Sequence, residues 1–125
     1  MKGKCYDLEK RTTLFAEKVI DFLRTLKQDA INRRLIEQCC GSAGSIGANY
    51  YEANEAESKK DFLHKIKIAI KEIKETKHWL QLLAKANPSQ VETCRELWQE
   101  AHQLLLIFSK IVVSIKKKDK EFENL

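Results

Sequence analysis

The sequence has few residues that interrupt regular structure: one proline, Pro88, and four glycines among 125 residues. A β sandwich or barrel needs many short strands separated by turns rich in glycine and proline. This scarcity therefore excludes such folds and indicates a few long elements. Hydrophobic residues make up 43% of the chain, which is too much for a disordered protein. The length fits a single domain over residues 1–125.

The cysteines lack the spacing of a metal site or a disulfide framework. They are Cys5, Cys39, Cys40 and Cys94, with no C-x-x-C pair and no histidine at zinc-ligand distance. The charged N-terminal sequence has no apolar signal segment, so we expect a cytoplasmic protein with buried free thiols. The most apolar stretch, from Leu104 to Ile115, is shorter than the roughly 20 residues that span a bilayer. We therefore expect no role for a membrane.

Apolar residues recur at steps of three and four along most of the chain, which predicts four helices at about 7–27, 29–56, 58–85 and 89–117. Asp7, Ser58 and Ser89 stand where helix-capping side chains are expected, and Asn87-Pro88 separates the last two helices. Short links between long helices favour antiparallel neighbours. The prediction is an all-α fold, an up-down-up-down four-helix bundle, with a frayed end from Lys116 to Leu125.

The second helix contains three glycines, Gly41, Gly44 and Gly47, and each costs about 1 kcal/mol relative to alanine inside a helix. No lysine follows them as a phosphate-binding loop requires. Cys40, Gly44 and Ala48 are spaced four apart on one face. This spacing predicts that a neighbouring backbone approaches the helix there.

The fourth helix is apolar around much of its circumference, beyond what one seam can bury. Because such a surface favours self-association, we expect a homo-oligomer held partly by this helix. Trp79 and Trp98 are expected to pack in or beside the core. The residues outside a single seam are Leu97, Leu104, Leu106, Ile107, Ile111 and Val113.

The chain resembles the four-helix bundle protein family, which includes proteins encoded in intervening sequences of large-subunit ribosomal RNA genes. It is also similar to the accessory variability determinant of diversity-generating retroelements. The resemblance is strong from about Leu14 to Leu83 and looser through the fourth helix. It is carried by Ser45-Ile46-Gly47-Ala48-Asn49-Tyr50-Tyr51-Glu52-Ala53, Ser58-Lys59-Lys60-Asp61-Phe62, Ile68-Ala69-Ile70-Lys71-Glu72-Ile73-Lys74-Glu75-Thr76 and Trp79-Leu80.

The resemblance implies a ring-like pentamer without known catalytic activity, and in the retroelement branch basic surfaces meet nucleic acid and a reverse transcriptase. Many relatives have an arginine pair shortly after the glutamine of the second helix. Here Gln38 is followed by Cys39, Cys40 and Gly41. This departure weakens any transfer of nucleic-acid binding to the second helix, and no functional residue is carried over.

The sequence offers no convincing catalytic or metal site. His64 and His78 each follow a carboxylate by three residues, as in di-iron bundles, yet both belong to one helix and fall opposite its apolar seam. That seam alternates steps of four and three through Phe62, Ile66, Ala69, Ile73, Thr76, Leu80 and Leu83. The cysteines have no histidine and acid positioned nearby to activate them. We therefore predict that the protein is not an enzyme and uses no cofactor or metal.

A row of one sign of charge lies opposite the seam of the third helix. Lys60, Lys67, Lys71 and Lys74 follow one another at helical spacing, with the two histidines between and after them and no carboxylate in the row. With a formal net charge of +5, this row favours binding of RNA or DNA, or of a nucleic-acid enzyme. The function hypothesis is a non-catalytic oligomeric scaffold with basic outer faces. The alternative is a protein–protein adaptor in which the charge serves only solubility.

Overall fold

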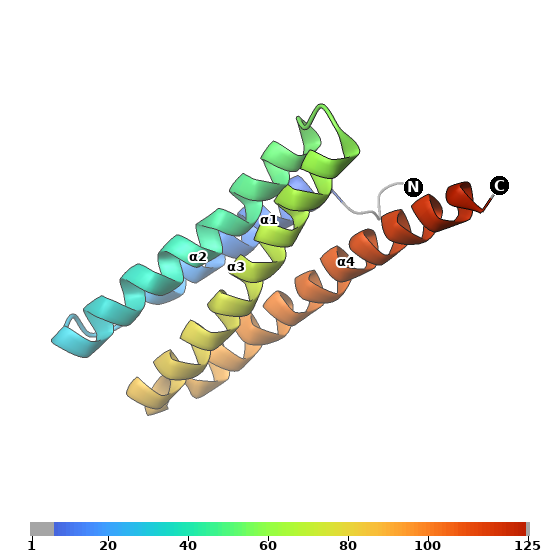
Figure 1. The fold of residues 1–125 in the computed structure, drawn as a ribbon. Helices are drawn as coiled ribbons and strands as arrows, with labels where there is room; N and C mark the ends of the chain where they lie inside the picture. The colour runs from blue at the N-terminus through green and yellow to red at the C-terminus, as the bar shows by residue number, and fades with distance from the viewer. Residues whose placement is uncertain (1–6, 125) are drawn as a thin grey trace.

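The structure is a computed structural model that describes residues 7–124 (Figure 1). The elements are α1 (Leu8–Arg24), α2 (Ala30–Asn54), α3 (Lys59–Ala86), the 3-10 turn η1 (Pro88–Gln90) and α4 (Val91–Glu123). Each helix packs on the next along the chain, and α4 returns to α1 through the smallest of the four contacts. The links are too short to cross the bundle, so neighbouring helices run antiparallel. The predicted antiparallel four-helix bundle is confirmed.

Three helices begin at side-chain caps. Oxygens of Asp7, Asp29 and Ser58 each accept a hydrogen bond from the backbone N–H three residues further on, at 2.8 to 3.0 Å. The capping box predicted at Ser89 is wrong. Pro88 opens η1 instead, and this turn continues directly into α4. Proline suits that position because its fixed φ fits a helical turn and its missing N–H leaves no donor unsatisfied.

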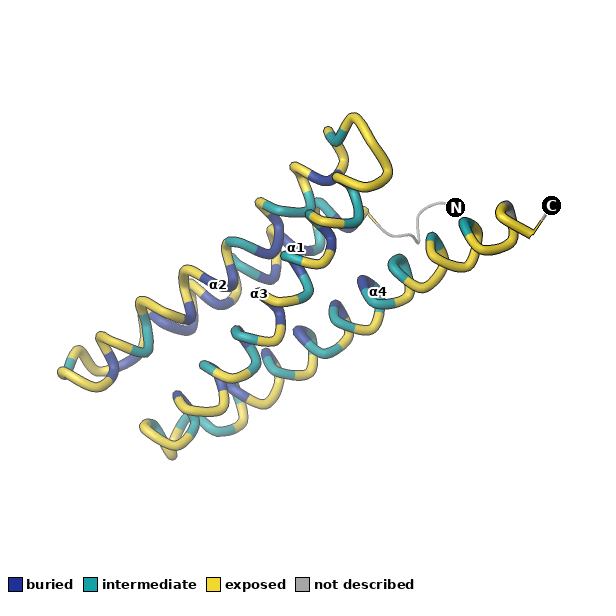
Figure 2. The backbone as a smooth tube through the Cα atoms, viewed as in Figure 1, coloured by how far each residue is buried: buried dark blue, intermediate teal, exposed yellow. Residues whose placement is uncertain are grey.

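The core is one apolar layer between the four helices, and Figure 2 shows the buried positions repeating along each inward face. On α3 the predicted seam is confirmed, since it is fully buried at Ile66, Ile73 and Leu80. Trp79 and Trp98 are partly buried and pack against this layer, as expected.

The fourth helix differs from the prediction in two respects. It continues to Glu123, past the predicted end near residue 117, so the expected frayed end is wrong for most of that segment. Figure 1 shows these last turns extending beyond the other helices. An ion pair of 2.6 Å between Lys59 Nζ and Asp119 Oδ1 ties them to the start of α3.

The second difference concerns which apolar residues of α4 stay outside the core. Leu97 and Leu104 were expected to be spare apolar surface, but both are buried in their own protomer. They pack inward because α4 contacts two helices, α3 and α1, and so buries a wider stripe than a single seam. Leu106 and Val113 remain 51% and 63% exposed, respectively.

The glycines of α2 do not act as the spacing predicted. Gly44 has no other element within 4 Å of the place where a Cβ would stand, so the predicted close approach at the Cys40, Gly44 and Ala48 face is wrong for the single chain. The close approach occurs at Gly47, where an added Cβ would lie 3.0 Å from Thr12 Oγ1 of α1. The register of α1 against α2 determines that Gly47, and not Gly44, lies at the close contact.

The thiols are free where the structure describes them. Cys39 and Cys94 are buried, as expected, whereas Cys40 is exposed. Cys5 lies outside the described residues. Burial raises the pKa of Cys39 to about 12 and that of Cys94 to about 11, so both thiols are protonated and unreactive at neutral pH.

Candidate nucleic-acid interface

The four lysines of the predicted row are all exposed on the outer face of α3, opposite its buried seam. They are Lys60, Lys67, Lys71 and Lys74, and we call them the lysine row. His64 and His78 are exposed on the same face. At 1.5 Å per residue the face from Lys60 to His78 is about 27 Å long. The helix geometry therefore gives the straight basic strip that the spacing predicted.

The ammonium groups of the lysine row are not neutralised by ion pairs. None of the four pairs with a carboxylate among residues 7–124. Two other lysines of α3 behave differently, because Lys59 pairs with Asp119 and Lys65 with Glu52. The row consequently keeps its charge available for an external anion.

Two glutamates lie beside the lysine row and weaken its field. Glu75 lines a shallow hollow together with Lys67, Lys71 and Lys74. Glu72 is partly buried, and its pKa is raised, first by desolvation and then by the charge of Glu75, against the opposing effect of Lys71. Lowering the pH therefore protonates Glu72 earlier than an ordinary glutamate and makes this surface more positive.

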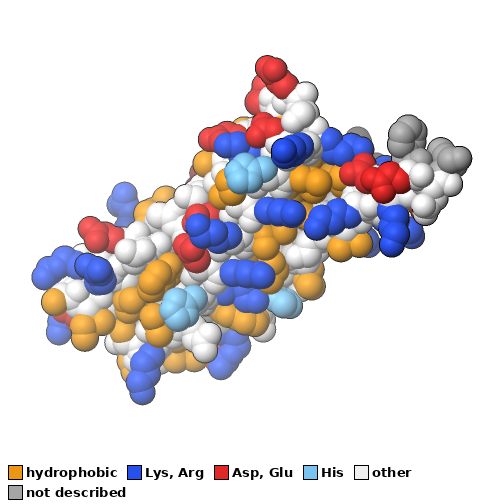
Figure 3. Space-filling view, in the orientation of Figure 1, with side chains coloured by type: hydrophobic (Ala, Val, Ile, Leu, Met, Phe, Trp, Pro, Cys, Tyr) orange, Lys and Arg blue, Asp and Glu red, His pale blue; other side chains and the backbone are white. Residues whose placement is uncertain are grey.

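The basic surface continues from α3 onto α4, which the sequence reasoning missed. The pair between Lys59 and Asp119 brings the end of α4 level with the start of the lysine row. Figure 3 shows lysine and arginine side chains spread over α3 and out along α4, with apolar and a few acidic side chains between them. The signal in the sequence was a cluster of exposed lysines read only as a solvated tail: Lys116, Lys117, Lys118 and Lys120.

Aromatic and basic side chains meet where α3 and α4 face each other. Lys77 Nζ lies 4.3 Å from the centre of the Trp98 ring and 2.9 Å from Nδ1 of His102. The rings of Trp98 and His102 stack with centroids 5.4 Å apart and an interplanar angle of 10°. Spacing along one helix could not reveal this cluster, because Lys77 comes from α3 and the two rings from α4.

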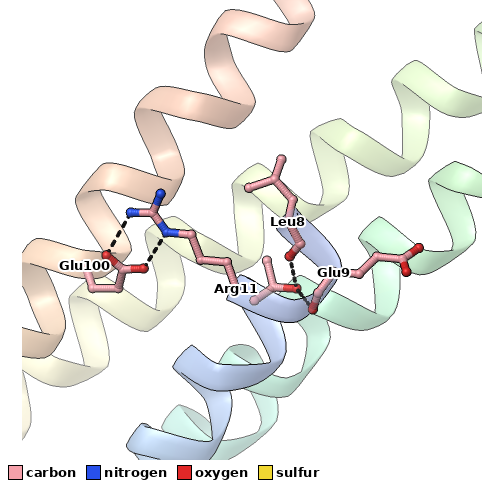
Figure 4. Close-up of polar contacts among 5 residues, drawn as sticks. Leu8, Glu9, Arg11 and Glu100 are labelled. Carbon is pink, nitrogen blue, oxygen red and sulfur yellow. Dashed lines mark hydrogen bonds and ion pairs between the residues drawn. The ribbon is translucent and has the colours of Figure 1, made fainter. Parts of the chain in front are cut away.

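On the side of α4 that faces away from the Lys77, Trp98 and His102 cluster, α4 and α1 form an open groove. Arg11 Nε and Nη2 donate to the two carboxylate oxygens of Glu100 at 2.8 and 3.0 Å, which bridges the two helices (Figure 4). Beyond this bridge the groove is lined by Leu8, Gln103, Ile107, Lys110, Ile111, Ser114 and Ile115. The isoleucines supply apolar surface that this chain covers only in part. The groove is suited to contact with another apolar helix.

The described part of the chain brings together no cluster of metal-ligating side chains. No three His, Cys, Asp or Glu side chains within residues 7–124 are placed to hold a metal ion. His64 and His78 stand on the outer face of α3, and His102 contacts Lys77 on the other helix. The described helices also include none long and apolar enough to cross a membrane.

Comparison with known proteins places this fold in a family. None of the functionally curated proteins matches the sequence. A crystal structure of a protein with unknown function from the S23 ribosomal protein family of Bacteroides thetaiotaomicron is similar, with 28% identity and a TM-score of 0.77. The match covers 83% of this chain and 96% of that one. Residues 5–110 match the family described as 23S rRNA-intervening sequence protein, and the chain belongs to that family.

Proposed function

We propose that the protein is a non-catalytic oligomeric scaffold that binds nucleic acid, or a ribonucleoprotein, through the basic face of α3 and α4. The observation that carries the proposal is the lysine row, exposed and without ion pairs over about 27 Å. A strip of this length matches several phosphate spacings of a nucleic-acid strand.

The chemistry of the row favours phosphate over a protein carboxylate surface. Lysine ammonium groups meet phosphates as point charges without fixed geometry, so a straight row of them follows a backbone and reads little sequence. The lysines at the end of α4 add positive charge on a second helix, beside the start of the lysine row. A repeating anionic polymer fits this layout better than a single small anion does.

The proposed oligomer would repeat the basic face around the assembly. The apolar groove between α1 and α4 lies on the other side of α4 from the Lys77 and Trp98 cluster. A second copy can therefore use the groove while the basic face stays open. A pentamer is the number that the family resemblance implies.

The test replaces all four residues of the lysine row with glutamine, which keeps helix propensity and leaves the buried seam unchanged. The matched control removes four positive charges from exposed positions around α1, at Lys10, Lys18, Arg24 and Lys27. Both proteins carry the same net charge. Fluorescence anisotropy with labelled RNA and DNA is measured across a salt series.

The row variant should bind at least tenfold more weakly and show a shallower dependence on salt, because each lost phosphate contact removes about 0.7 to 0.9 from the logarithmic slope. The control should resemble the unmodified protein. Equal weakening of both variants would show that only net charge matters. Unchanged binding of the row variant, or salt-insensitive capture of a protein partner with no affinity for nucleic acid, would contradict the proposal and favour the adaptor.

A further inference from the structure

A second hollow lies between α3 and α4, toward the turn that joins them. Its lining on α3 begins at Leu80, two residues after His78, the last residue on the face of the lysine row. Its lining comes from both helices: Leu80, Gln81, Ala84, Val91, Cys94, Arg95, Trp98 and Gln99. We call it the Trp98 hollow. Its volume is about 400 Å³, which is enough to hold a small planar group.

The floor of the Trp98 hollow is apolar and uncharged. Leu80 and Cys94 are buried there, and Ala84 is partly buried. Burial raises the pKa of Cys94 to about 11, so its thiol stays protonated at neutral pH. A flat apolar ring can therefore occupy the floor without removing a charge from water.

One wall of the hollow is the indole of Trp98, and its position is fixed by neighbours on both helices. Lys77 lies over the ring, and the ring of His102 stacks on it. An ammonium group can only donate, so Nδ1 of His102 accepts from Lys77 and the ring proton is on Nε2. The aromatic wall is thus held in place before any ligand arrives, which lowers the entropy cost of binding.

The rim of the hollow carries polar groups that have no hydrogen-bond partner among residues 7–124. The amides of Gln81 and Gln99 and the indole N–H of Trp98 form no hydrogen bond with any residue in 7–124, and no buried polar side-chain atom there lacks a partner. These groups therefore face solvent at the edge of the hollow. Each amide can donate and accept, as the edge of a nucleobase requires.

We propose that the Trp98 hollow binds one unpaired nucleobase of a single-stranded nucleic acid whose backbone continues along the lysine row. This rests on the function proposed above and adds the class of nucleic acid. A base has two apolar faces and a polar edge, which match the floor, the aromatic wall and the amide rim. A base inside a duplex is stacked on both faces and cannot enter. Lys77 supplies positive charge beside the hollow for a flanking phosphate. Arg95 also lines the hollow, but it is paired with Glu92.

The first experiment uses Trp98 as its own reporter. The chain has two tryptophans, so the Trp79→Phe variant leaves Trp98 as the only one. Its fluorescence is followed during titration with a short single strand and with a duplex of the same sequence, at one low salt concentration. Stacking of a base should quench the emission with the single strand and leave it nearly unchanged with the duplex. RNA and DNA versions of the strand show which sugar is preferred.

The second experiment measures the contribution of stacking to affinity. Trp98→Leu should weaken binding of the single strand about 30-fold, the middle of the range for loss of one stacked base, and leave duplex binding unchanged. Trp98→Phe should retain most of the affinity because a stacking surface remains. Trp79→Leu, which changes the other tryptophan, is the matched control and should bind normally. Thermal melts check folding, and if Trp98→Leu does not fold, quenching in Trp79→Phe decides.

The outcomes separate this proposal from the function on which it rests. Equal quenching by duplex and single strand, or full affinity of a folded Trp98→Leu variant, would overturn base binding at the Trp98 hollow. The proposed function would still stand if the glutamine variant of the lysine row lost binding. Quenching by an apolar peptide but not by a single strand would also overturn it. Absence of binding to any nucleic acid would overturn both.

Discussion

Asn32 and Asn87 face each other as a pair of amides at one end of the bundle. Each Nδ2 donates to the other's Oδ1 at 2.9 Å, so the two side chains form a closed pair. Asn32 also donates to the carbonyl of Lys27, and Asn87 to that of Leu83. The pair thereby joins the link between α1 and α2 to the link between α3 and α4.

This pair predicts a clear loss of stability when one member is removed. Asn32 is only 2% exposed, so Asn32→Ala leaves the partly buried Asn87 amide short of a partner and should destabilise the protein by about 2 kcal/mol. Asn87→Ala should cost a similar amount. Because both changes break the same contact, the double variant should cost clearly less than the sum. Urea unfolding of the unmodified protein, the two single variants and the double variant completes a double-mutant cycle. Strictly additive losses of stability would argue against the amide pair.

Two glycines of α2 should respond in opposite ways to the same substitution. Gly44→Ala should stabilise the protomer by about 0.5 to 1 kcal/mol, since nothing lies within 4 Å of the new methyl group and alanine favours the helix. Gly47→Ala should destabilise it, because the methyl group meets Thr12 Oγ1 at 3.0 Å. That hydroxyl cannot move freely, as it donates to the Leu8 and Glu9 carbonyls (Figure 4).

Thermal or urea unfolding of these two alanine variants measures the difference. A destabilised Gly44→Ala protein would indicate that its face is covered, for example by another copy of the chain. A stabilised Gly47→Ala protein would mean that α1 and α2 can separate at little cost.

These glycines show where sequence reasoning reaches its limit. Periodicity within one helix predicted the bundle, the seam of α3 and the exposed lysine row, because each depends on the helical repeat alone. The contact of Gly47 with Thr12, the amide pair and the Trp98 hollow each combine two helices. Their prediction requires the rotation and register of one helix against another, which spacing along the chain does not contain.

The buried thiol of Cys39 should make stability fall with rising pH above about 9. Its pKa is raised from 9.0 to about 12, chiefly by burial, so the folded protein retains a proton that the unfolded chain releases. This stability is fully present below pH 9 and is lost toward pH 12, by at most about 1.4 kcal/mol per pH unit. Urea unfolding at pH 8 and pH 10 measures the decline.

Two alanine variants isolate the thiol from the other groups that titrate in this range. Cys39→Ala should show a smaller decline between pH 8 and pH 10 than the unmodified protein. Cys40→Ala changes the neighbouring exposed thiol and should keep the full decline. Identical declines in all three proteins would show that Cys39 ionises without cost in the folded state.

The proposed oligomer predicts different effects for the same substitution at two neighbouring residues of α4. Ser114 is exposed and lines the groove between α1 and α4, whereas Val113 is 63% exposed and does not line it. Ser114→Glu places a charge in the apolar groove without disturbing the core, so it should dissociate an oligomer that buries this surface. Val113→Glu should leave the oligomer intact. Light scattering at micromolar concentration, with thermal melts to verify folding, gives the mass of each protein. The reverse pattern would place the interface on the other side of α4, and a monomeric unmodified protein would refute self-association.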